Sequence, residues 1–363
     1  MCSFMKKESQ RLMIVTSALA CIGIVMVYSS SSCYAYEKFY DGAYYLKRHL
    51  SHFIIGLFIA AATMRVDYRK LKDYTKPLLL LAILGLLFSF VPGIGHEAGG
   101  AKRWVRFGSF GFQPSEFAGL FLIIYLAGAL EKKQGYIRNF FYGFMPPLMA
   151  AGAVVLLILA QPDLGSAAML LSVSIIMLFA AGANMAYLVP FVVTAVPVFY
   201  FLIIKVPYRL RRIVGYLDPW SDTQGAGFQI IQSFLALGSG GVLGLGLGAS
   251  RQKLFYLPQA HTDFIFSIIG EETGLIGTLS IVVLFVVLIW LGITISIKAR
   301  DLFGKFLALG ITVGIALKAF INIAVSTGAI PTKGLPLPFI SYGGTALVLN
   351  MIGIALLLNI AEQ

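Results

Sequence analysis

Charged residues are scarce along this chain. Only 12% of its 363 residues are charged, whereas 58% are hydrophobic, and the mean hydropathy is +0.86. No soluble core is that apolar, so the composition excludes a soluble protein and indicates one that crosses a membrane several times. It also leaves no soluble domain that could bind nucleic acid.

Cysteine pairs, internal repeats and a cleavage signal are also missing. The three cysteines, Cys2, Cys21 and Cys33, have neither metal-ligand spacing nor an obvious disulfide partner. No internal repeat is apparent, which weakens a transporter built from inverted repeats. Lys6 and Lys7 precede the first apolar run, but no A-x-A cleavage site follows it. We therefore expect an uncleaved first helix.

Long apolar runs, in contrast, are abundant. They are longer than strands and lack the alternation of strands, so we expect helices. The sequence predicts an all-α integral membrane fold with ten transmembrane helices, forming a single domain over residues 1–363. The ten expected spans are about 11–28, 49–65, 77–91, 114–130, 144–160, 164–182, 187–205, 263–297, 305–327 and 340–361.

The excess of basic residues bears on orientation. The net charge is +12, and the short segment 65–76 alone holds Arg65, Arg69, Lys70, Lys72 and Lys76. Short basic loops favour the cytoplasmic side, which predicts cytoplasmic N- and C-termini. The basic residues left on the outer side predict a cationic surface for an anionic ligand such as a diphosphate. Contact with anionic lipid headgroups is the alternative.

One long outer loop is expected at residues 206–262. Within it, 228–237 is apolar but too short to span, and Phe228, Ile231 and Phe234 recur at helical spacing. This pattern predicts a short amphipathic or re-entrant helix. The glycines after it permit tight turns and anion-binding amides, although a purely structural turn explains them equally well.

Asp263 ends this loop. A carboxylate at a membrane boundary is costly unless it has a function. His261, Arg251 and Lys253 lie near it in sequence. Such a carboxylate can act as a general base on a hydroxyl while cations hold a phosphate leaving group. The simpler alternative is that Asp263 caps the next helix.

Other outer segments carry further polar candidates. Glu116 follows a proline in the first turn of a predicted helix, as a ligand contact or as a simple cap. Asp163, between two spans, is expected to be a helix cap. Lys333 and Ser341 offer polar groups in a proline-stiffened segment before the last span.

Two charged residues are expected deep in the membrane. Glu271 lies two turns beyond Asp263, about 12 Å further along the helix, and Lys318 lies about 13 Å below the outer end of its own helix. This match in depth predicts a buried ion pair between Lys318 and Glu271 or its neighbour Glu272.

Several strings of residues resemble a known family. They are YLDPWSDTQGAGFQIIQS, ALGSGG, SRQKLFYLPQAHTDFIF, GGAKRW, FQPSEF and PTKGLPLPFISYGG. They are similar to the SEDS proteins of shape, elongation, division and sporulation, from about residue 45 to the end. The sequences SRQKLFYLP and PTKGLPLPFISYGG are closer to the division branch, FtsW, than to the RodA branch. The sporulation relative SpoVE is also similar.

The resemblance implies a ten-helix peptidoglycan glycosyltransferase of the bacterial cytoplasmic membrane, acting at the division septum. It implies polymerisation of lipid II at the outer face, inversion at the sugar and release of undecaprenyl diphosphate. The family's essential acid corresponds to Asp263, which would deprotonate the 4-hydroxyl of the acceptor sugar. Lys102, Arg103, Glu116 and Arg48 match further family positions. Together with His261, Lys333 and Ser341, they are the candidate substrate-binding residues.

The resemblance also implies partners. These are an FtsI-like class B penicillin-binding transpeptidase and divisome regulators of the FtsQ, FtsL and FtsB type. The residues predict no metal site, and whether Mg²⁺ or Mn²⁺ assists the diphosphate stays open. The chain departs from the family at Gly119, where a lysine is usual, and at Lys318, where glutamine is expected.

Two other functions are compatible with the sequence. A lipid II flippase should spread its polar residues along a path through the membrane, whereas here they gather on the outer half. A non-catalytic scaffold for a transpeptidase is the second alternative, because a family lysine is missing.

Overall fold

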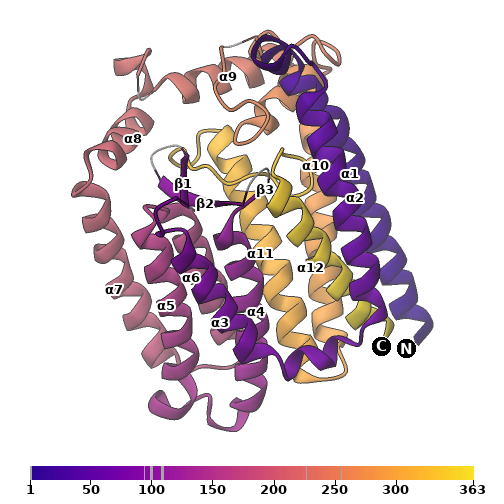
Figure 1. Ribbon diagram of the computed structural model, residues 1–363, viewed down its shortest axis with the longest axis vertical. Helices are drawn as coiled ribbons and strands as arrows, with labels where there is room; N and C mark the ends of the chain where they lie inside the picture. The colour runs from indigo at the N-terminus through magenta and orange to yellow at the C-terminus, as the bar shows by residue number, and fades with distance from the viewer. Residues whose placement is uncertain (1, 94, 99–100, 108–109, 226, 255) are drawn as a thin grey trace.

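The computed structural model describes residues 2–93, 95–98, 101–107, 110–225, 227–254 and 256–363. Long helices run roughly parallel between two ends of the molecule, and both termini lie together at one end (Figure 1). The helices are α1 (Cys2–Phe39), α2 (Tyr44–Arg65), α3 (Thr75–Phe88), α4 (Pro114–Lys132), α5 (Met145–Ala160), α6 (Leu164–Ala180), α7 (Met185–Ile204), α8 (Pro207–Leu217), α9 (Phe228–Gly240), α10 (Ile265–Lys298), α11 (Leu302–Ser326) and α12 (Gly344–Glu362).

Short elements connect these helices. An antiparallel sheet of three strands lies between α3 and α4, in the order β1 (Gly95–Ala98), β2 (Ala101–Phe107) and β3 (Phe110–Phe112). The remaining turns are η1 (Tyr68–Lys72), η2 (Gln134–Tyr136), η3 (Phe140–Phe144) and η4 (Pro219–Asp222). The sequence prediction contained neither this sheet nor α8, because both segments are short and rich in charge.

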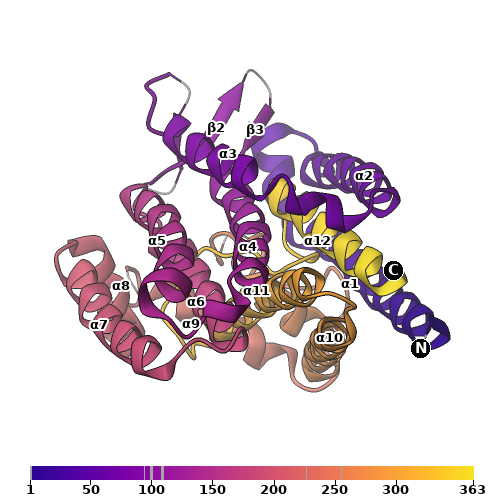
Figure 2. The same cartoon turned by 90° about the horizontal axis from the view of Figure 1, so that it is seen from below.

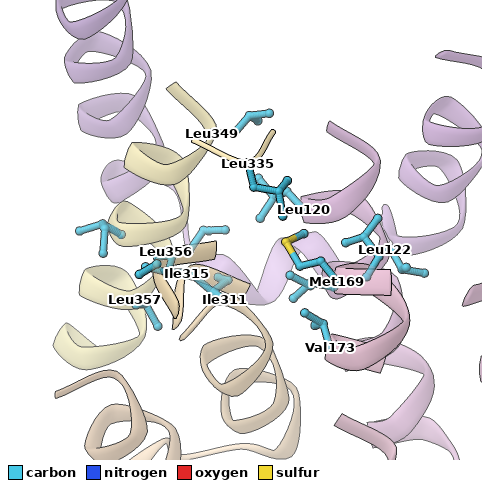
Figure 3. Packing of buried hydrophobic residues seen from close by; sticks show 14 of the residues in the cluster. Leu120, Leu122, Met169, Val173, Ile311, Ile315, Leu335, Leu349, Leu356 and Leu357 are labelled. Atoms are coloured by element: carbon cyan, nitrogen blue, oxygen red, sulfur yellow. The ribbon is translucent and has the colours of Figure 1, made fainter. Parts of the chain in front are cut away.

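The apolar core lies between α4, α6, α11 and α12. Leu122, Met169, Ile311 and Leu357, one from each of these helices, belong to the buried cluster there (Figure 3). Nearly the whole length of α12 is buried, whereas α7 stands at the edge with little of its surface covered (Figure 2). A helix that is apolar all round and exposed is suited to contact lipid, so this arrangement fits a membrane protein.

Seven helices among the described residues are long and apolar enough to cross a membrane, or up to eight if a bent pair counts as one span. The bent pair is α2 with the η1–α3 segment, which meet at 90°. Two expected spans are short, because α3 has 14 residues and α6 has 17, whereas a span needs about 20. The multi-span helical fold is confirmed, and the count of ten spans stays a prediction.

The expected short helix in the long loop is present as α9, which begins at Phe228 and continues to Gly240. Its buried residues include Ile230, Ile231 and Ser233, so one side faces the protein. Together with α8, it covers the end of the molecule that lies opposite the termini (Figure 1).

Candidate functional site

A cavity of about 2380 Å³ is lined by residues of α8, the sheet and several long helices. Drug-sized pockets occupy about 300–1000 Å³, so this cavity suits a much larger ligand. One part of its wall is apolar and formed by membrane helices, with Ile55 from α2, Leu84 from α3, Phe121 from α4 and Ile203 from α7. A ligand with a long hydrocarbon part could therefore lie against this wall.

The other part of the cavity is cationic. Arginine or lysine side chains reach it from three elements and a loop, and they are Arg48 of α2, Arg103 of β2, Arg209 and Arg212 of α8, and Lys333 of the segment before α12. Burial lowers the pKa of Lys333, and the nearby Asp163 carboxylate opposes this effect. Cations gathered around one space favour a multiply charged anion.

Asp263 lies in the wall of this cationic region. Helix α10 begins at Ile265 with Phe264 at its cap position, so Asp263 precedes the helix rather than capping it. A turn centred on Gln259 orients the residue, because the carbonyl of Gln259 accepts bonds from the amides of Thr262 and Asp263, both at 3.1 Å. Gln259 has a φ of 58°, an unusual conformation that is common near functional sites.

The surroundings of Asp263 make it a weak acid that can still ionise. Burial raises the pKa of Asp263 to about 6, whereas the charges of Arg212 and Arg103 lower it. A carboxylate with a pKa of about 6 is ionised at neutral pH and accepts a proton more readily than a surface aspartate. This is the property that a general base needs.

His261 and Ser341 support Asp263 rather than line the cavity. The described lining includes neither residue. The amide of Tyr342 donates to the His261 carbonyl at 2.9 Å, and the Ser341 hydroxyl donates to the Thr262 carbonyl at 2.6 Å. Both bonds fix the backbone just before Asp263. Direct contact of His261 and Ser341 with substrate stays a prediction, and the bonds that the structure shows for them are contacts within the protein.

The His261 ring packs among aromatic side chains. Its centroid lies 4.6 Å from that of Tyr45, 5.8 Å from Tyr34 and 5.9 Å from Tyr342. Burial lowers the pKa of His261 to about 4. The ring is therefore neutral near pH 7, and it joins α1 and α2 to the loop before α10.

Asp163 caps α6 as expected. Its carboxylate accepts bonds from the amide and the hydroxyl of Ser166, at 3.1 and 2.9 Å. It also faces the cavity, where the Nε atom of Arg103 lies 3.5 Å from its Oδ2 atom. Asp163 therefore holds Arg103 near Asp263 as well as capping its helix.

The predicted ion pair between Glu271 and Lys318 is wrong. Lys318 of α11 instead bonds Glu116 of α4, with 2.5 Å between Nζ and Oε2. Both side chains are buried and line a small separate cavity of about 50 Å³, together with Gly119. Depth along a helix could be estimated from the sequence, but the side of the helix on which each residue lies depends on tertiary packing. Glu116 is a structural partner of Lys318 and lies outside the described lining of the large cavity.

Glu271 and Glu272 anchor the glycine-rich part of the long loop. Glu271 accepts hydrogen bonds from the Ser250 hydroxyl and the Arg251 amide, the latter at 2.9 Å. Glu272 bonds Lys253 at 2.8 Å and the Ser29 hydroxyl of α1 at 2.7 Å. These contacts fasten the loop to α10 and α1 over a stretch that ends ten residues before Asp263.

The structure describes only one of two further expected substrate contacts. Arg48 lines the cavity, and its guanidinium lies 5.2 Å from the Tyr44 ring. Lys102 lies in β2, but its side chain is outside the described part of the structure.

Across the described residues, no group of three or more His, Cys, Asp or Glu side chains is arranged to hold a metal ion.

Sequence reasoning missed Arg209 and Arg212 as site residues. A signal for them was present, because the string PYRLRRIVGYL alternates arginine with apolar residues at helical spacing. This pattern is typical of a helix at a membrane surface. In the folded chain, Arg212 also donates to the Thr332 carbonyl at 3.2 Å, which ties α8 to the loop of Lys333.

Known proteins resemble the chain over nearly its full length. A model of the FtsW, RodA and SpoVE family, described as cell cycle proteins, matches residues 10–363. A probable peptidoglycan glycosyltransferase FtsW of Geobacter sulfurreducens is 48% identical, covering 98% of this chain and 97% of the relative. Stage V sporulation protein E of Bacillus subtilis is 44% identical, covering 97% and 96%.

Solved structures share the fold. A chain from a peptidoglycan synthase complex, described for its coordination of polymerization and crosslinking, matches with a TM-score of 0.76 and 28% identity over 96% of both chains. The rod shape determining protein RodA of Thermus thermophilus matches with a TM-score of 0.72 and 25% identity. That match covers 96% of this chain and 95% of RodA.

Proposed function

Because the chain belongs to the FtsW, RodA and SpoVE family of cell cycle proteins, we propose that it is a peptidoglycan glycosyltransferase of cell division. It polymerises lipid II into glycan strands at the outer face of the bacterial cytoplasmic membrane. The two-part cavity carries this proposal. Its apolar wall suits a polyprenyl chain, and its five cations suit the attached diphosphate.

Asp263 is the general base in this proposal. It takes the proton from the 4-hydroxyl of the acceptor sugar while the hydroxyl oxygen attacks the anomeric carbon of the donor. The new glycosidic bond forms as the bond to the diphosphate oxygen breaks, with inversion at carbon. Undecaprenyl diphosphate leaves, and Arg103, Arg212 and Lys333 stabilise its charge.

The partner in this proposal is a class B penicillin-binding transpeptidase of the FtsI type, with divisome regulators. One structural relative comes from a complex that polymerises and crosslinks peptidoglycan. A polymerase and a crosslinking enzyme act on the same strand, so their association is chemically reasonable. Helix α8, which lines the cavity, lies at the end of the molecule away from the termini (Figure 1), which is consistent with cytoplasmic termini and an active site outside.

The test uses the purified protein with its transpeptidase partner and lipid II. We expect the wild-type protein to form polymer and the Asp263→Ala variant to lose about 10²–10⁴-fold in rate, the usual contribution of a general base. Equal rates would contradict the role of Asp263. Absence of polymer from the wild type would favour the scaffold, and movement of lipid II across vesicles without polymer would favour the flippase.

A further inference from the structure

Three consecutive carbonyls next to the reacting carboxylate each accept a hydrogen bond from the C-terminal part of the chain. His261 accepts from the Tyr342 amide and Thr262 from the Ser341 hydroxyl. The carbonyl of Asp263 itself accepts from the side-chain amide of Asn322, at 3.0 Å. The carbonyls of residues 261–263 are therefore held by the C-terminal part of the chain, while the amides of Thr262 and Asp263 bond the Gln259 carbonyl.

Asn322 differs from the other two donors because it stands on a rigid helix. It lies in α11, fully buried, one turn beyond Lys318. Lys318 is in turn bonded to Glu116 of α4. The position of Asn322 is thus set by the helical core rather than by a loop, and groups on rigid elements are placed more accurately than groups on loops.

The same amide joins Asp263 to the loop of Lys333. The Nδ2 atom of Asn322 also donates to the Leu335 carbonyl, at 2.8 Å. Gly334 lies between Lys333 and Leu335, close enough to Asp263 that a Cβ atom at position 334 would stand 3.0 Å from the Asp263 Oδ2 atom. One side chain therefore sets the spacing between the carboxylate and a cationic loop of the cavity.

The side chain of Asn322 has a cost in folding free energy that packing alone does not explain. Its Oδ1 atom is buried and has no hydrogen-bond partner among the described residues, which typically costs about 1–3 kcal/mol. An apolar residue would avoid that cost but would leave the carbonyls of Asp263 and Leu335 without the donor that they share. Departures of this kind from good packing are expected where a residue serves function.

We propose that Asn322 is a positioning residue that holds the carboxylate of Asp263 in register with Lys333. The proposal rests on the role of Asp263 as the base. Asn322 does not touch substrate; it acts through the backbone of residues 263 and 335. A displacement of about 1 Å at a reacting group can cost on the order of 10²-fold in rate.

The test compares two matched variants, Asn322→Leu and Asn359→Leu. Asn359 is also buried, and its Nδ2 atom also donates to backbone carbonyls, those of Met64 at 2.9 Å and Val66 at 2.8 Å. It lies at the far end of the molecule, near the C-terminus. Both variants lose amide bonds to carbonyls, but only the first loses them at the site.

We expect kcat of Asn322→Leu to fall by about 10- to 100-fold with little change in KM for lipid II, and the acidic limb of its pH profile to move. Asn359→Leu should lose comparable thermal stability and keep the wild-type kcat.

If the Asn322→Leu variant does not fold, Asn322→Ser, whose side chain fills less space, replaces it in the same measurements. A kcat within twofold of wild type in a folded Asn322 variant, with Asp263→Asn inactive, would overturn the positioning role alone. Activity in Asp263→Asn would overturn the base and with it this inference.

Discussion

At the scale of single residues, Asp263 combines a functional gain with a cost in stability. Burial raises its pKa from 3.8 in the unfolded chain to about 6 in the folded protein. Folding therefore favours the protonated form. The contribution of protonated Asp263 to the free energy of unfolding is complete below about pH 4. It is lost as the pH rises through 6, and the total loss is roughly 3 kcal/mol. At neutral pH the ionised carboxylate is destabilising, as is common for catalytic groups.

Replacement of this residue should separate activity from stability. We expect Asp263→Asn to abolish polymerisation and to raise the thermal stability at pH 7.5, because the neutral amide avoids burial of a charge. The wild-type kcat should fall as the pH drops below about 6, since the base becomes protonated. Thermal melting in detergent and a pH–rate profile measure these effects. If Asp263→Asn is less stable than the wild type at pH 7.5, burial of the ionised carboxylate does not destabilise the folded protein.

The ion pair of Lys318 and Glu116 provides a second prediction. Removal of one partner leaves a buried charge, so Lys318→Gln should lose about 3–5 kcal/mol of stability. The double charge reversal, Glu116→Lys with Lys318→Glu, should restore the ion pair and keep most of the stability that Lys318→Gln loses. Lys47→Met is the control, because its partner Asp41 is solvent-exposed, and it should melt like the wild type.

Gly119 makes a further exchange possible. It lines the same small cavity as Lys318, and a Cβ atom there would stand 3.2 Å from the Leu170 side chain. A lysine at 119 would lie one helical turn from Glu116. We expect Gly119→Lys to rescue the thermal stability of Lys318→Gln. If the double variant, Gly119→Lys with Lys318→Gln, is as unstable as Lys318→Gln alone, the positive charge must come from α11 to stabilise the protein.

At the scale of elements, a break in α10 joins the long loop to the bundle. Gly274 has a φ of 67°, which favours glycine. The amide of Leu275 bonds the Gly241 carbonyl at 2.9 Å, and the Leu245 amide bonds the Glu271 carbonyl at 3.0 Å. The loop therefore packs into the break as an added layer of backbone, and the Glu271 and Glu272 side chains hold the neighbouring segment 250–253.

Loss of this anchor should release the loop. Glu271→Gln replaces an acceptor of the Ser250, Arg251 and Gln252 donors with a group that carries its own hydrogens. We expect faster hydrogen exchange over residues 245–254 and about tenfold lower activity, with the core helices unchanged. Glu131→Gln, which weakens a partly buried ion pair with Lys72, is the control. Equal exchange in both variants would mean that the loop is held by other contacts.

At the scale of the whole molecule, α8 and α9 of the long loop lie at the end opposite the termini (Figure 1). With cytoplasmic termini, α9 and the cavity face outward. On a background without the native cysteines, Ser239→Cys on α9 should react with an impermeant thiol reagent in intact cells. Lys132→Cys, at the end of α4, should react only after lysis. The reverse pattern would invert the orientation.

Some of the site could be predicted from the sequence. Asp263, Arg103, Arg48 and Lys333 were identified from their charges near predicted helix ends and from family motifs, and all four line the cavity. Asn322 could not be identified, because an asparagine within an apolar helix has no local signature of its partners.

The sequence alone determined which segments are apolar helices, where the short helix of the loop begins and which charged residues need an explanation. These are local properties, set by composition and periodicity along the chain. Tertiary structure decided which charges meet. Lys318 bonds Glu116 rather than Glu271, and three carbonyls before α10 face α11 and the segment after it. Such pairings depend on how each helix is rotated against its neighbours, which one-dimensional spacing does not specify.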